Sequence, residues 1–525
     1  MKRRTLLAAG ATLMAMPRTS LAQAKTVLRV IPQADLAILD PGITTATVTR
    51  NHGFMVYDTL YGLNAAGEPV PEMVEGHTVS EDGLTWTLTL RPGLRFHDNS
   101  PVRASDCVAS IKRWARRDGF GKTLMGATEE LAASDDRTLR FKLKRPFALL
   151  PQALAKTVPY VPFILPERVI PEDPSKALTE VIGSGPYRFV ASERVPGSRV
   201  VYEKFDGYVP RPTGTPGLSS GPKIAHFDRV EWHVIPDAAT ALAAIRKGEV
   251  DWWERPIPDL LPLAKTDKSL KLEITNRGGT IAFLQFNHLH PPFNNVAIRR
   301  LVLQTINQAE FAEAIGGSDP SLRGGKVGLF LPGGPMANEA GLELMAGRRD
   351  FNALKRELEA AGYKGERVVM LVGTDSAVNN ATSEVAADLL RKMGFNVDYQ
   401  TMDWGSVVQR RTNQQPVDKG GWSLFAVSAD GDFFLDPTVV PSIRANGRDA
   451  WIGWPDSPGV EALYRDWFLA PDTAKRQAIA RDLQLQTLRD VTWIPVAQVF
   501  LPTVLRQDVT GVLPGFIKGW NVQKA

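Results

Sequence analysis

The first part of the chain alternates hydrophobic and polar residues in the manner of β-strands. Residues 84–90 (Leu-Thr-Trp-Thr-Leu-Thr-Leu) alternate strictly, which is the period of a strand with one buried face. Shorter stretches at 27–31 and 138–143 predict further strands, the second of them in an antiparallel sheet. A helix is predicted at 105–116. This region therefore predicts a sheet accompanied by at least one helix.

Turn and cap residues divide the middle of the chain. A tight Gly-Ser-Gly-Pro turn precedes a predicted strand at 187–190. Asp237 is placed to cap a helix at 238–247, which Gly248 ends, and a strand is expected at 249–253. These short elements are consistent with a continuation of the same sheet.

The second half has a different pattern, in which apolar runs alternate with longer helical segments. Strands are predicted at 281–286, 368–372, 395–401, 422–427 and 494–505, and helices at 296–315, 351–361, 376–393, 405–413 and 471–490. The regular alternation of helix and strand from 351 to 427 predicts βαβ crossovers. We therefore expect a largely parallel sheet that is covered on both faces.

Composition and charge remove one class of function. The chain has 525 residues, of which 43% are hydrophobic and 23% charged, as in ordinary globular proteins. Its formal net charge is +5, but four of the 62 basic residues and none of the 57 acids lie in the first 24 residues. The remaining 58 basic residues leave a net charge of +1. Net charge therefore gives no support to nucleic-acid binding.

The first 24 residues have the three parts of a secretory signal peptide. A basic head (Met1–Arg4) is followed by an apolar stretch and by Ala22-Gln23-Ala24, a small-x-small cleavage site. The apolar stretch is about 12 residues long, too short to cross a bilayer as a helix. Arg3-Arg4 fits a twin-arginine address as well as the general secretory (Sec) route, and both stay open, as does a buried N-terminal helix. We expect an exported, periplasmic protein without membrane insertion.

Motifs of catalytic and metal sites are missing from the sequence. It has no Gly-x-Ser-x-Gly, no complete phosphate-binding loop and no His-Glu-x-x-His. His288 and His290 could ligate a metal from an extended segment, although a polar loop is the simpler interpretation. Cys107 is the only cysteine and is expected to pack inside a helix. We therefore predict no catalytic residue, no metal site and no cofactor.

Aromatic and acidic residues gather where a ligand could bind. Trp404 follows one predicted parallel strand, and Trp422 and Phe425 begin the next. Asp430 and Asp432 lie in the loop after that strand. In open α/β sheets, ligands bind beyond the carboxyl ends of the strands. The pattern predicts a small-molecule site at this edge, unless the aromatic residues simply pack in the core.

Several blocks of sequence resemble the bacterial extracellular solute-binding proteins of family 5. The blocks lie in order at 83–98, 101–108, 183–187, 286–308 and 493–496. The departures in this region are small: Asn99, between the first two blocks, replaces the usual Gly, and Cys107, in the second block, replaces the usual Val. Proteins of this family are the binding components of peptide- and nickel-type ABC importers.

The resemblance implies an α/β fold of the two-lobed periplasmic binding protein type, class II-like and of cluster C. The first lobe would be discontinuous, with an inserted subdomain and two crossings to the second lobe. The implied division is residues 1–24 for the signal peptide, 25–60, 184–275 and 493–525 for lobe I, 61–183 for the inserted subdomain, and 276–492 for lobe II. The ligand would be trapped between closing lobes of a monomer, which a membrane permease then recognises.

The resemblance carries over to binding residues only loosely. Peptide binders of the family hold the ligand's amino terminus with an acid soon after a Gly-Trp strand. Here Gly421-Trp422 is followed by Leu424-Phe425-Ala426, and acids return only at Asp430 and Asp432. The sequence therefore leaves open whether the specificity is a simple one for dipeptides. Opines, sugars, antibiotics, glutathione and metal chelates, which the family also binds, stay open as ligands.

The complete set of predicted ligand-binding residues comes from both lobes: Asp35, Tyr187, Asn287, Trp404, Trp422, Phe425, Asp430 and Asp432. The expected function is capture of a small solute, foremost a peptide or peptide-like compound, without enzymatic activity. Two other functions stay open: an exported hydrolase acting in the interlobe cleft, and a periplasmic chaperone that binds peptides loosely.

Overall fold

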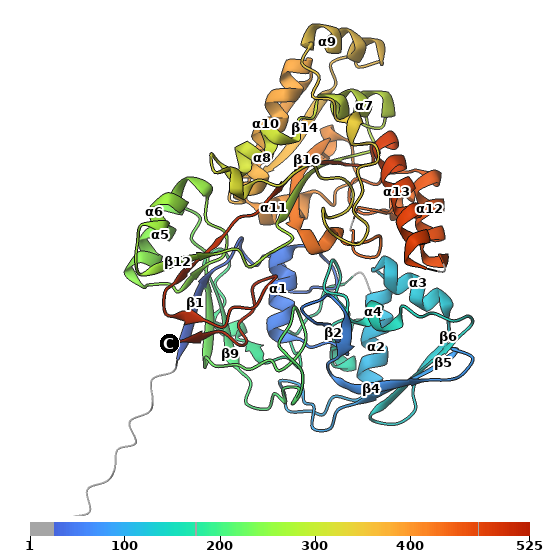
Figure 1. Ribbon diagram of the computed structural model, residues 1–525, viewed down its shortest axis with the longest axis vertical. Helices are drawn as coiled ribbons and strands as arrows, with labels where there is room; N and C mark the ends of the chain where they lie inside the picture. Colours follow the sequence, from blue (N-terminus) through green and yellow to red (C-terminus); the bar gives the residue numbers. More distant parts are fainter. Residues whose placement is uncertain (1–25, 174–175, 441, 471) are drawn as a thin grey trace, which may run out of the picture.

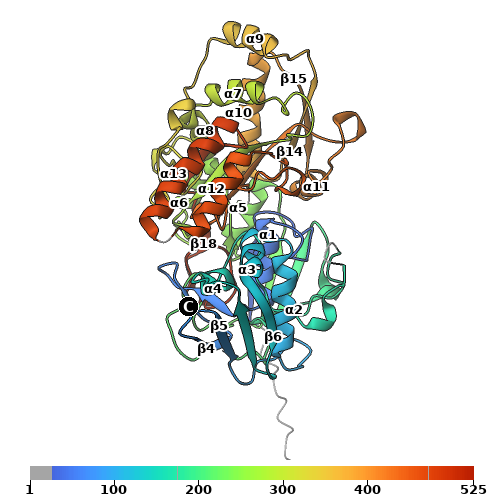
Figure 2. The same cartoon turned by 90° about the vertical axis from the view of Figure 1, so that its right-hand side faces the viewer.

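The computed structural model describes residues 26–173, 176–440, 442–470 and 472–525. The predicted signal peptide, residues 1–24, lies outside these ranges. Two lobes are stacked along the long axis of the molecule (Figures 1 and 2). The lower lobe in Figure 1 is built on a seven-stranded sheet and the upper lobe on a five-stranded sheet.

The first lobe is a mixed sheet assembled from distant parts of the chain. Its strand order is β12 (Leu270–Glu273), β18 (Thr503–Arg506), β11 (Trp252–Trp253), β1 (Val27–Ile31), β10 (Arg229–His233), β9 (Arg199–Lys204) and β8 (Tyr187–Phe189). Helix α5 (Ala238–Lys247) begins as predicted, with Asp237 accepting from the Thr240 amide, and ends at Gly248, which has a φ of 74°. Helices α1 (Thr47–Val56) and α6 (Leu261–Lys265) complete the lobe, with a small pair of strands, β19 (Val509–Thr510) and β20 (Gln523–Lys524).

An antiparallel subdomain is inserted into this lobe, at the lower right of Figure 1. Its sheet has the order β4 (Val74–Val79), β5 (Thr85–Leu90), β7 (Thr138–Leu143) and β6 (Thr128–Ala133), and β2 (Tyr61–Leu63) pairs with β3 (Pro69–Pro71) beside it. Helices α2 (Ala104–Ala115), α3 (Gly119–Ala127) and α4 (Leu150–Leu154) pack with these strands. The predicted alternation is confirmed, since Trp86, Leu88 and Leu90 are buried, and Cys107 is fully buried in α2.

The second lobe confirms the predicted alternation of helix and strand. Its sheet has the order β15 (Asn396–Met402), β14 (Arg367–Gly373), β16 (Leu424–Asp430), β13 (Thr280–Phe286) and β17 (Ile494–Val499). Strand β14 is parallel to both of its neighbours, whereas β13 is antiparallel to β16 and β17. The helices are α7 (Val296–Thr305), α8 (Gln308–Gly316), α9 (Phe351–Ala360), α10 (Ala377–Met393), α11 (Trp404–Arg410), α12 (Pro458–Leu469) and α13 (Thr473–Asp490). Helices cover both faces, so each face has its own core.

Two predicted elements are divided in the structure. The helix expected at 296–315 is two helices, because the chain turns at Ile306 and the side chain of Asn307 caps the second helix through the Ala309 amide. The strand expected at 494–505 is also two strands, and they lie in different sheets. Strand β17 pairs with β13 in the second lobe, whereas β18 pairs with β11 and β12 in the first. The return crossing is therefore at residues 500–502 rather than at 493, and the outward crossing is at 274–279.

Within the ranges that the structure describes, no helix combines the length and the apolar character needed to cross a membrane.

Candidate ligand-binding cleft

Three neighbouring cavities lie at the boundary between the two lobes. The central cavity, about 40 Å³, is lined by Thr45–Val48 from the first lobe and by Trp404, Arg411 and Trp451 from the second. The hinge-side cavity, about 80 Å³, contains Asp35 and reaches the crossing segment at Leu501. It shares Gln33, Ala34 and Ser376 with the central cavity. The two cavities are therefore adjacent parts of one cleft.

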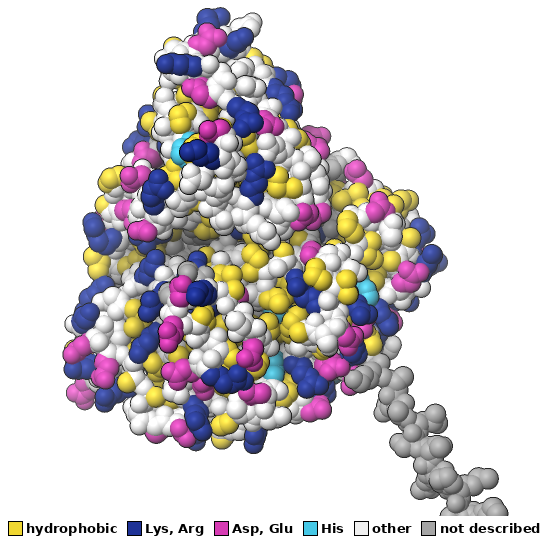
Figure 3. Space-filling model, turned by 180° about the vertical axis from the view of Figure 1, so that it is seen from behind, with side chains coloured by type: hydrophobic (Ala, Val, Ile, Leu, Met, Phe, Trp, Pro, Cys, Tyr) yellow, Lys and Arg dark blue, Asp and Glu magenta, His cyan; other side chains and the backbone are white. Residues whose placement is uncertain are grey.

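The third or outer cavity is much larger, about 430 Å³, and lies between the inserted subdomain and the second lobe. It shares Trp451 with the central cavity. Its lining is rich in charged and aromatic side chains, among them Lys122, Lys156, Tyr160, Arg444, Arg448 and Tyr464. Figure 3 shows the molecule hollowed at the boundary of the lobes, with Lys and Arg side chains beside the hollow. The volume is within the range of small-molecule sites, about 300–1,000 Å³.

Trp404 and Asp35 are the two predicted residues that line these cavities. Trp404 is the first residue of α11, and its amide donates to Asp375 at 2.7 Å. Asp35 lies in the hinge-side cavity, where its Oδ1 is buried without a hydrogen-bond partner. Burial raises the pKa of Asp375, and the nearby charges of Asp403 and Asp35 raise it further. The hinge-side cavity therefore brings together two carboxyl groups, Asp35 and Asp375, and it is also lined by Arg255.

Four other predicted residues pack in the interior and do not line the three cavities. Trp422 and Phe425 are fully buried in the core of the second lobe, where the Trp422 indole donates to the Arg411 carbonyl at 2.9 Å. The Asn287 amide donates to the Trp422 carbonyl at 2.9 Å, and the Tyr187 hydroxyl donates to the Gly519 carbonyl at 3.3 Å. The polar groups of Trp422, Asn287 and Tyr187 donate to backbone carbonyls. We therefore assign all four residues to packing in the core.

Asp430 and Asp432 form an ion cluster that joins the two lobes. Asp430, at the end of β16, pairs with Arg50 of α1 at 2.8 Å and with Arg255 at 2.6 Å, and Asp432 lies 3.7 Å from Arg50. Burial opposes the charge of Asp430, but Arg255 and Arg50 hold its pKa below the usual value. Burial raises the pKa of Asp432 to about 6. Since two first-lobe arginines already neutralise Asp430, it is not free to bind a ligand's ammonium group.

The two histidines considered as metal ligands are bound to the backbone instead. The Nε2 of His288 donates to the Thr492 carbonyl at 3.0 Å, and that of His290 to the Gln414 carbonyl at 2.9 Å. Burial lowers the pKa of His288 to about 3. Among the residues that the structure describes, no three His, Cys, Asp or Glu side chains lie close enough to hold a metal ion.

Arg411, the most unusual charged group of the cleft, is not among the binding residues that the sequence predicts. It is only 3% exposed, and no hydrogen bond or ion pair of its guanidinium occurs among the described residues. The rings of Trp404, Phe425 and Trp451 have their centroids 5.8, 5.7 and 5.6 Å from the guanidinium carbon. Burial lowers its pKa to about 10. In the sequence nothing distinguishes Arg411 from the adjacent Arg410, because only burial separates them.

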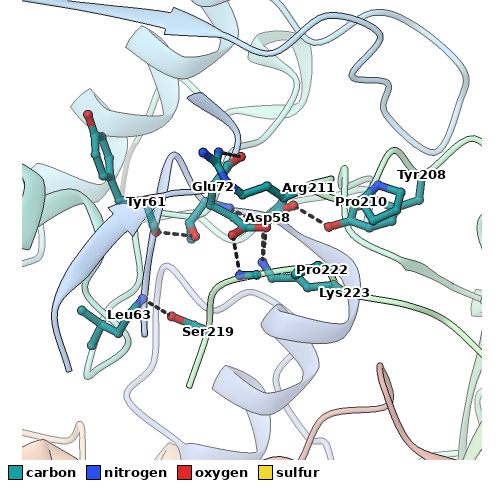
Figure 4. Close-up of polar contacts among 12 residues, drawn as sticks. Asp58, Tyr61, Leu63, Glu72, Tyr208, Pro210, Arg211, Ser219, Pro222 and Lys223 are labelled. Atoms are coloured by element: carbon teal, nitrogen blue, oxygen red, sulfur yellow. Dashed lines mark hydrogen bonds and ion pairs between the residues drawn. The ribbon is translucent and has the colours of Figure 1, made fainter. Parts of the chain in front are cut away.

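A second buried charge cluster, whose residues line none of the three cavities, shows how such groups are usually paired. Lys223 lies 2.5 Å from Asp58 and 3.8 Å from Glu72 (Figure 4). The Tyr208 hydroxyl donates to Asp58 at 3.0 Å, and the Gly221 amide donates to Glu72 at 3.0 Å. Burial alone would lower the pKa of Lys223, but the two carboxylates raise it. This cluster ties the loop before β10 to the start of the inserted subdomain.

Two lobes joined by two crossings, with cavities between them, define the class of two-lobed periplasmic binding proteins. Comparison with known proteins identifies the family. The bacterial extracellular solute-binding proteins, family 5 (middle part), match residues 68–449, and the chain belongs to this family. It is therefore a solute-binding protein, and the family is one of binding proteins rather than of enzymes.

Individual relatives agree with this assignment. The chain is 36% identical to a probable peptide ABC transporter periplasmic-binding protein, y4tO, of Sinorhizobium fredii, over 99% of this chain and 98% of that protein. It is 25% identical to the glutathione-binding protein GsiB of Pectobacterium atrosepticum, over 97% and 95% of the two chains. The periplasmic binding protein DppA of Helicobacter pylori, solved with the peptide STSA, has the same fold, with a TM-score of 0.77, 20% identity, and 95% and 98% of the chains covered.

Proposed function

We propose that the protein captures a peptide or peptide-like solute in the periplasm and delivers it to the permease of an ABC importer. Family membership and the similarity to the y4tO protein over nearly its whole length support the importer role. The observation that carries the proposal is the cleft itself, because its cavities are lined from both lobes. Such a site is complete only when the lobes are closed.

The interlobe contacts support closure on a ligand. Arg50 and Arg255 of the first lobe pair with Asp430 of the second, and the Trp451 indole donates to the Thr45 hydroxyl at 3.3 Å. Aromatic rings of the two lobes also pack directly, since Phe120 of the inserted subdomain and Phe468 of the second lobe have their ring centroids 5.6 Å apart. A solute that bridges the lobes would add the contacts that make closure favourable.

The distribution of charge in the cleft favours a zwitterionic solute. Asp430, the first acid after the Gly421-Trp422 strand, is neutralised by Arg50 and Arg255 and cannot hold an ammonium group. We therefore assign the ligand's ammonium group to Asp35, whose buried Oδ1 has no partner. Trp404 supplies an apolar wall in the adjacent central cavity. The outer cavity has room for further side chains.

Export is part of this proposal. Residues 1–24 act as a signal peptide for the general secretory or the twin-arginine route, and the mature protein works as a monomer. Fusion of residues 1–24 to a reporter that is active only after twin-arginine export, with Arg3-Arg4 replaced by Lys-Lys as control, separates the two routes.

Native mass spectrometry of protein purified without added ligand, followed by thermal unfolding with a tripeptide library, tests the function. A solute at 100 times its dissociation constant stabilises the protein by about 2.7 kcal/mol. X-ray scattering is expected to show compaction with the same peptides. If no peptide stabilises or compacts the protein, the proposal fails, and equal stabilisation by every peptide favours a chaperone instead.

The assignment of Asp35 has its own test. Asp35→Asn is expected to weaken a bound tripeptide about tenfold, since a charge-assisted hydrogen bond is lost. N-acetylation of the same tripeptide removes the ammonium charge and should make wild type and variant equal. Asp206→Asn, at an exposed position of the first lobe, is the matched control.

A further inference from the structure

Arg411 differs from every other buried arginine of the described chain because its guanidinium has aromatic neighbours but no hydrogen-bonding or ionic partner. Four arginines are buried there: Arg50, Arg91, Arg299 and Arg411. Arg50 pairs with Asp430, and Arg91 donates to the carbonyls of Glu72 and Val209. Arg299 donates to the carbonyls of Phe293, Asp490 and Val491. A buried charge without partners is costly, so the isolation of Arg411 needs an explanation.

The opposite wall of the central cavity is the uncapped start of helix α1. Thr45–Val48 line this cavity, and Ala46, at the N-cap, has no side chain that could accept from the first turn. The first turn also contains no acidic residue. The amides of Thr47, Val48 and Thr49 have no partner inside the helix, because the first amides of any α-helix lack one. A helix N-terminus of this kind attracts an anion.

The cavity therefore brings together two independent sets of donors from opposite lobes. Arg411 belongs to the second lobe and α1 to the first, and both line the same 40 Å³ space. A third donor, the side-chain amide nitrogen of Gln33, lines the cavity too and is buried without a partner. The acids Asp430 and Asp432 are paired with Arg50 and do not line it. Three buried side-chain atoms of this lining have no partner: two are donors, the Gln33 amide nitrogen and the Arg411 Nε, and one is an acceptor, the Asn379 amide oxygen.

We propose that the central cavity is a carboxylate subsite, in which Arg411 and the N-terminal amides of α1 hold one carboxylate of the transported solute. A guanidinium presents a planar set of donors that matches a carboxylate. The aromatic rings around Arg411 favour a flat group over a tetrahedral one, and a water needs only about 10–15 Å³, so the cavity fits a carboxylate but not a whole peptide. The rest of the solute occupies the hinge-side and outer cavities.

This subsite would also couple binding to closure. One carboxylate oxygen faces Arg411 in the second lobe and the other faces α1 in the first, so the group links the lobes directly. The inference rests on the proposed function, since it names the chemical group by which that same cleft holds its solute. It adds that a solute without a carboxylate loses this link.

Small probes test the subsite without knowledge of the natural solute. In chloride-free buffer, ¹³C-acetate is titrated into the full protein and followed by NMR, and acetamide serves as its neutral counterpart. We expect acetate to bind at least tenfold more tightly than acetamide, and Arg411→Gln to remove this preference. Arg410→Gln is the matched control, because Arg410 is adjacent in sequence, partly exposed, and donates only to the Gly420 carbonyl. Equal binding of acetate to wild type and to Arg411→Gln would overturn the proposal.

A second variant tests the other wall and does not depend on how Arg411→Gln folds. Ala46→Asp places a carboxylate at the N-cap of α1, at a backbone conformation that Asp adopts readily (φ −64°, ψ 127°). This built-in anion is expected to raise the melting temperature of the empty protein and to weaken acetate at least tenfold. Ala46→Asn caps the helix without the charge and should weaken acetate less. Undiminished acetate binding in Ala46→Asp would contradict the proposal.

A tripeptide and its C-terminal amide separate this inference from the proposed function. If Ala-Ala-Ala and Ala-Ala-Ala amide bind the wild type equally, peptide capture stands and the carboxylate subsite fails. If acetate binds through Arg411 but no tripeptide binds, the subsite stands and the peptide class fails. Succinate, added as a third probe, identifies a non-peptide acid as the solute in that second case.

Discussion

Two buried cations, Lys223 in the first lobe and Arg411 in the cleft, have opposite surroundings. Lys223 is 2% exposed at its side chain and lies beside two carboxylates, Asp58 and Glu72. Arg411 is equally buried, but aromatic rings surround it and no carboxylate pairs with it among the described residues. The first arrangement is complete within the chain, whereas the second is complete only with an anion from outside. A buried charge that has its partner within the chain therefore indicates a structural role. A buried charge without such a partner indicates a role in binding.

Removal of Lys223 is expected to have the largest effect. Lys223→Met leaves Asp58 and Glu72 buried without a cation, which should cost about 3–5 kcal/mol of unfolding free energy. Urea unfolding measures this loss. Lys112→Met, at an exposed position of α2, is the control and should change stability little. A loss in Lys223→Met no greater than in the control would mean that Lys223 is not a structural cation.

The pH dependence of stability comes next. Burial raises the pKa of Glu72 from 4.5 to about 7, despite the opposing charge of Lys223. Between these values the folded state keeps a proton that the unfolded state has lost, so Glu72 makes stability fall as pH rises from 4.5 to 7. Its contribution is at most about 3 kcal/mol. Glu72→Gln should remove this part of the slope in urea unfolding at several pH values, whereas Glu249→Gln, at an exposed site, should leave it; an unchanged slope in Glu72→Gln would refute the assignment.

The interlobe ion cluster lies between Lys223 and Arg411 in how far the chain supplies its partners. Its charges are paired within the chain, but only across the closed cleft. Asp430→Asn removes the carboxylate that pairs with Arg255 and leaves Arg50 only Asp432, 3.7 Å away, so it should destabilise the closed form by about 2 kcal/mol. X-ray scattering should show a larger radius of gyration for the empty variant than for the wild type. Asp398→Asn removes a partly exposed ion pair within the second lobe and serves as control. An unchanged radius in Asp430→Asn would show that other contacts hold the lobes together.

Replacement of Arg411 is expected to have the smallest effect on stability and the largest effect on binding. Arg411→Met removes a buried charge that has no partner, so the empty protein should keep its stability or gain up to about 1 kcal/mol. The same variant should lose its preference for acetate over acetamide. Thermal unfolding of the empty protein and the acetate titration, carried out on one preparation, check both halves. A loss of stability like that of Lys223→Met would instead make Arg411 a structural residue.

Much of the fold could be predicted because it depends on local patterns of hydrophobic and polar residues. Strict alternation at 84–90 gave a strand with buried Trp86, Leu88 and Leu90, and the alternation of helix and strand after 351 gave the parallel core of the second lobe. The exact position of the return crossing could not be predicted. Residues 494–505 are apolar and extended throughout, and only the pairing of β17 with β13 and of β18 with β12 divides them.

The candidate site was predicted less completely, because aromatic and acidic residues look alike in the core and in a cleft. Trp404 and Trp422 are separated by only one loop and a helix, yet the first lines the central cavity and the second is fully buried. The sequence predicts that Asp430 faces a ligand, but two arginines that are distant in sequence neutralise it.

The sequence by itself determined the family, the class of fold and the small net charge of the chain without its first 24 residues, because these depend on composition, spacing and ordered blocks. Only the tertiary structure decided which charges have partners. Pairing depends on distances between side chains hundreds of residues apart, as between Arg50 and Asp430, and no local pattern contains them. The proposed binding role of Arg411 depends on tertiary structure in the same way. The fold surrounds Arg411 with aromatic rings and places the start of α1 at the same cavity.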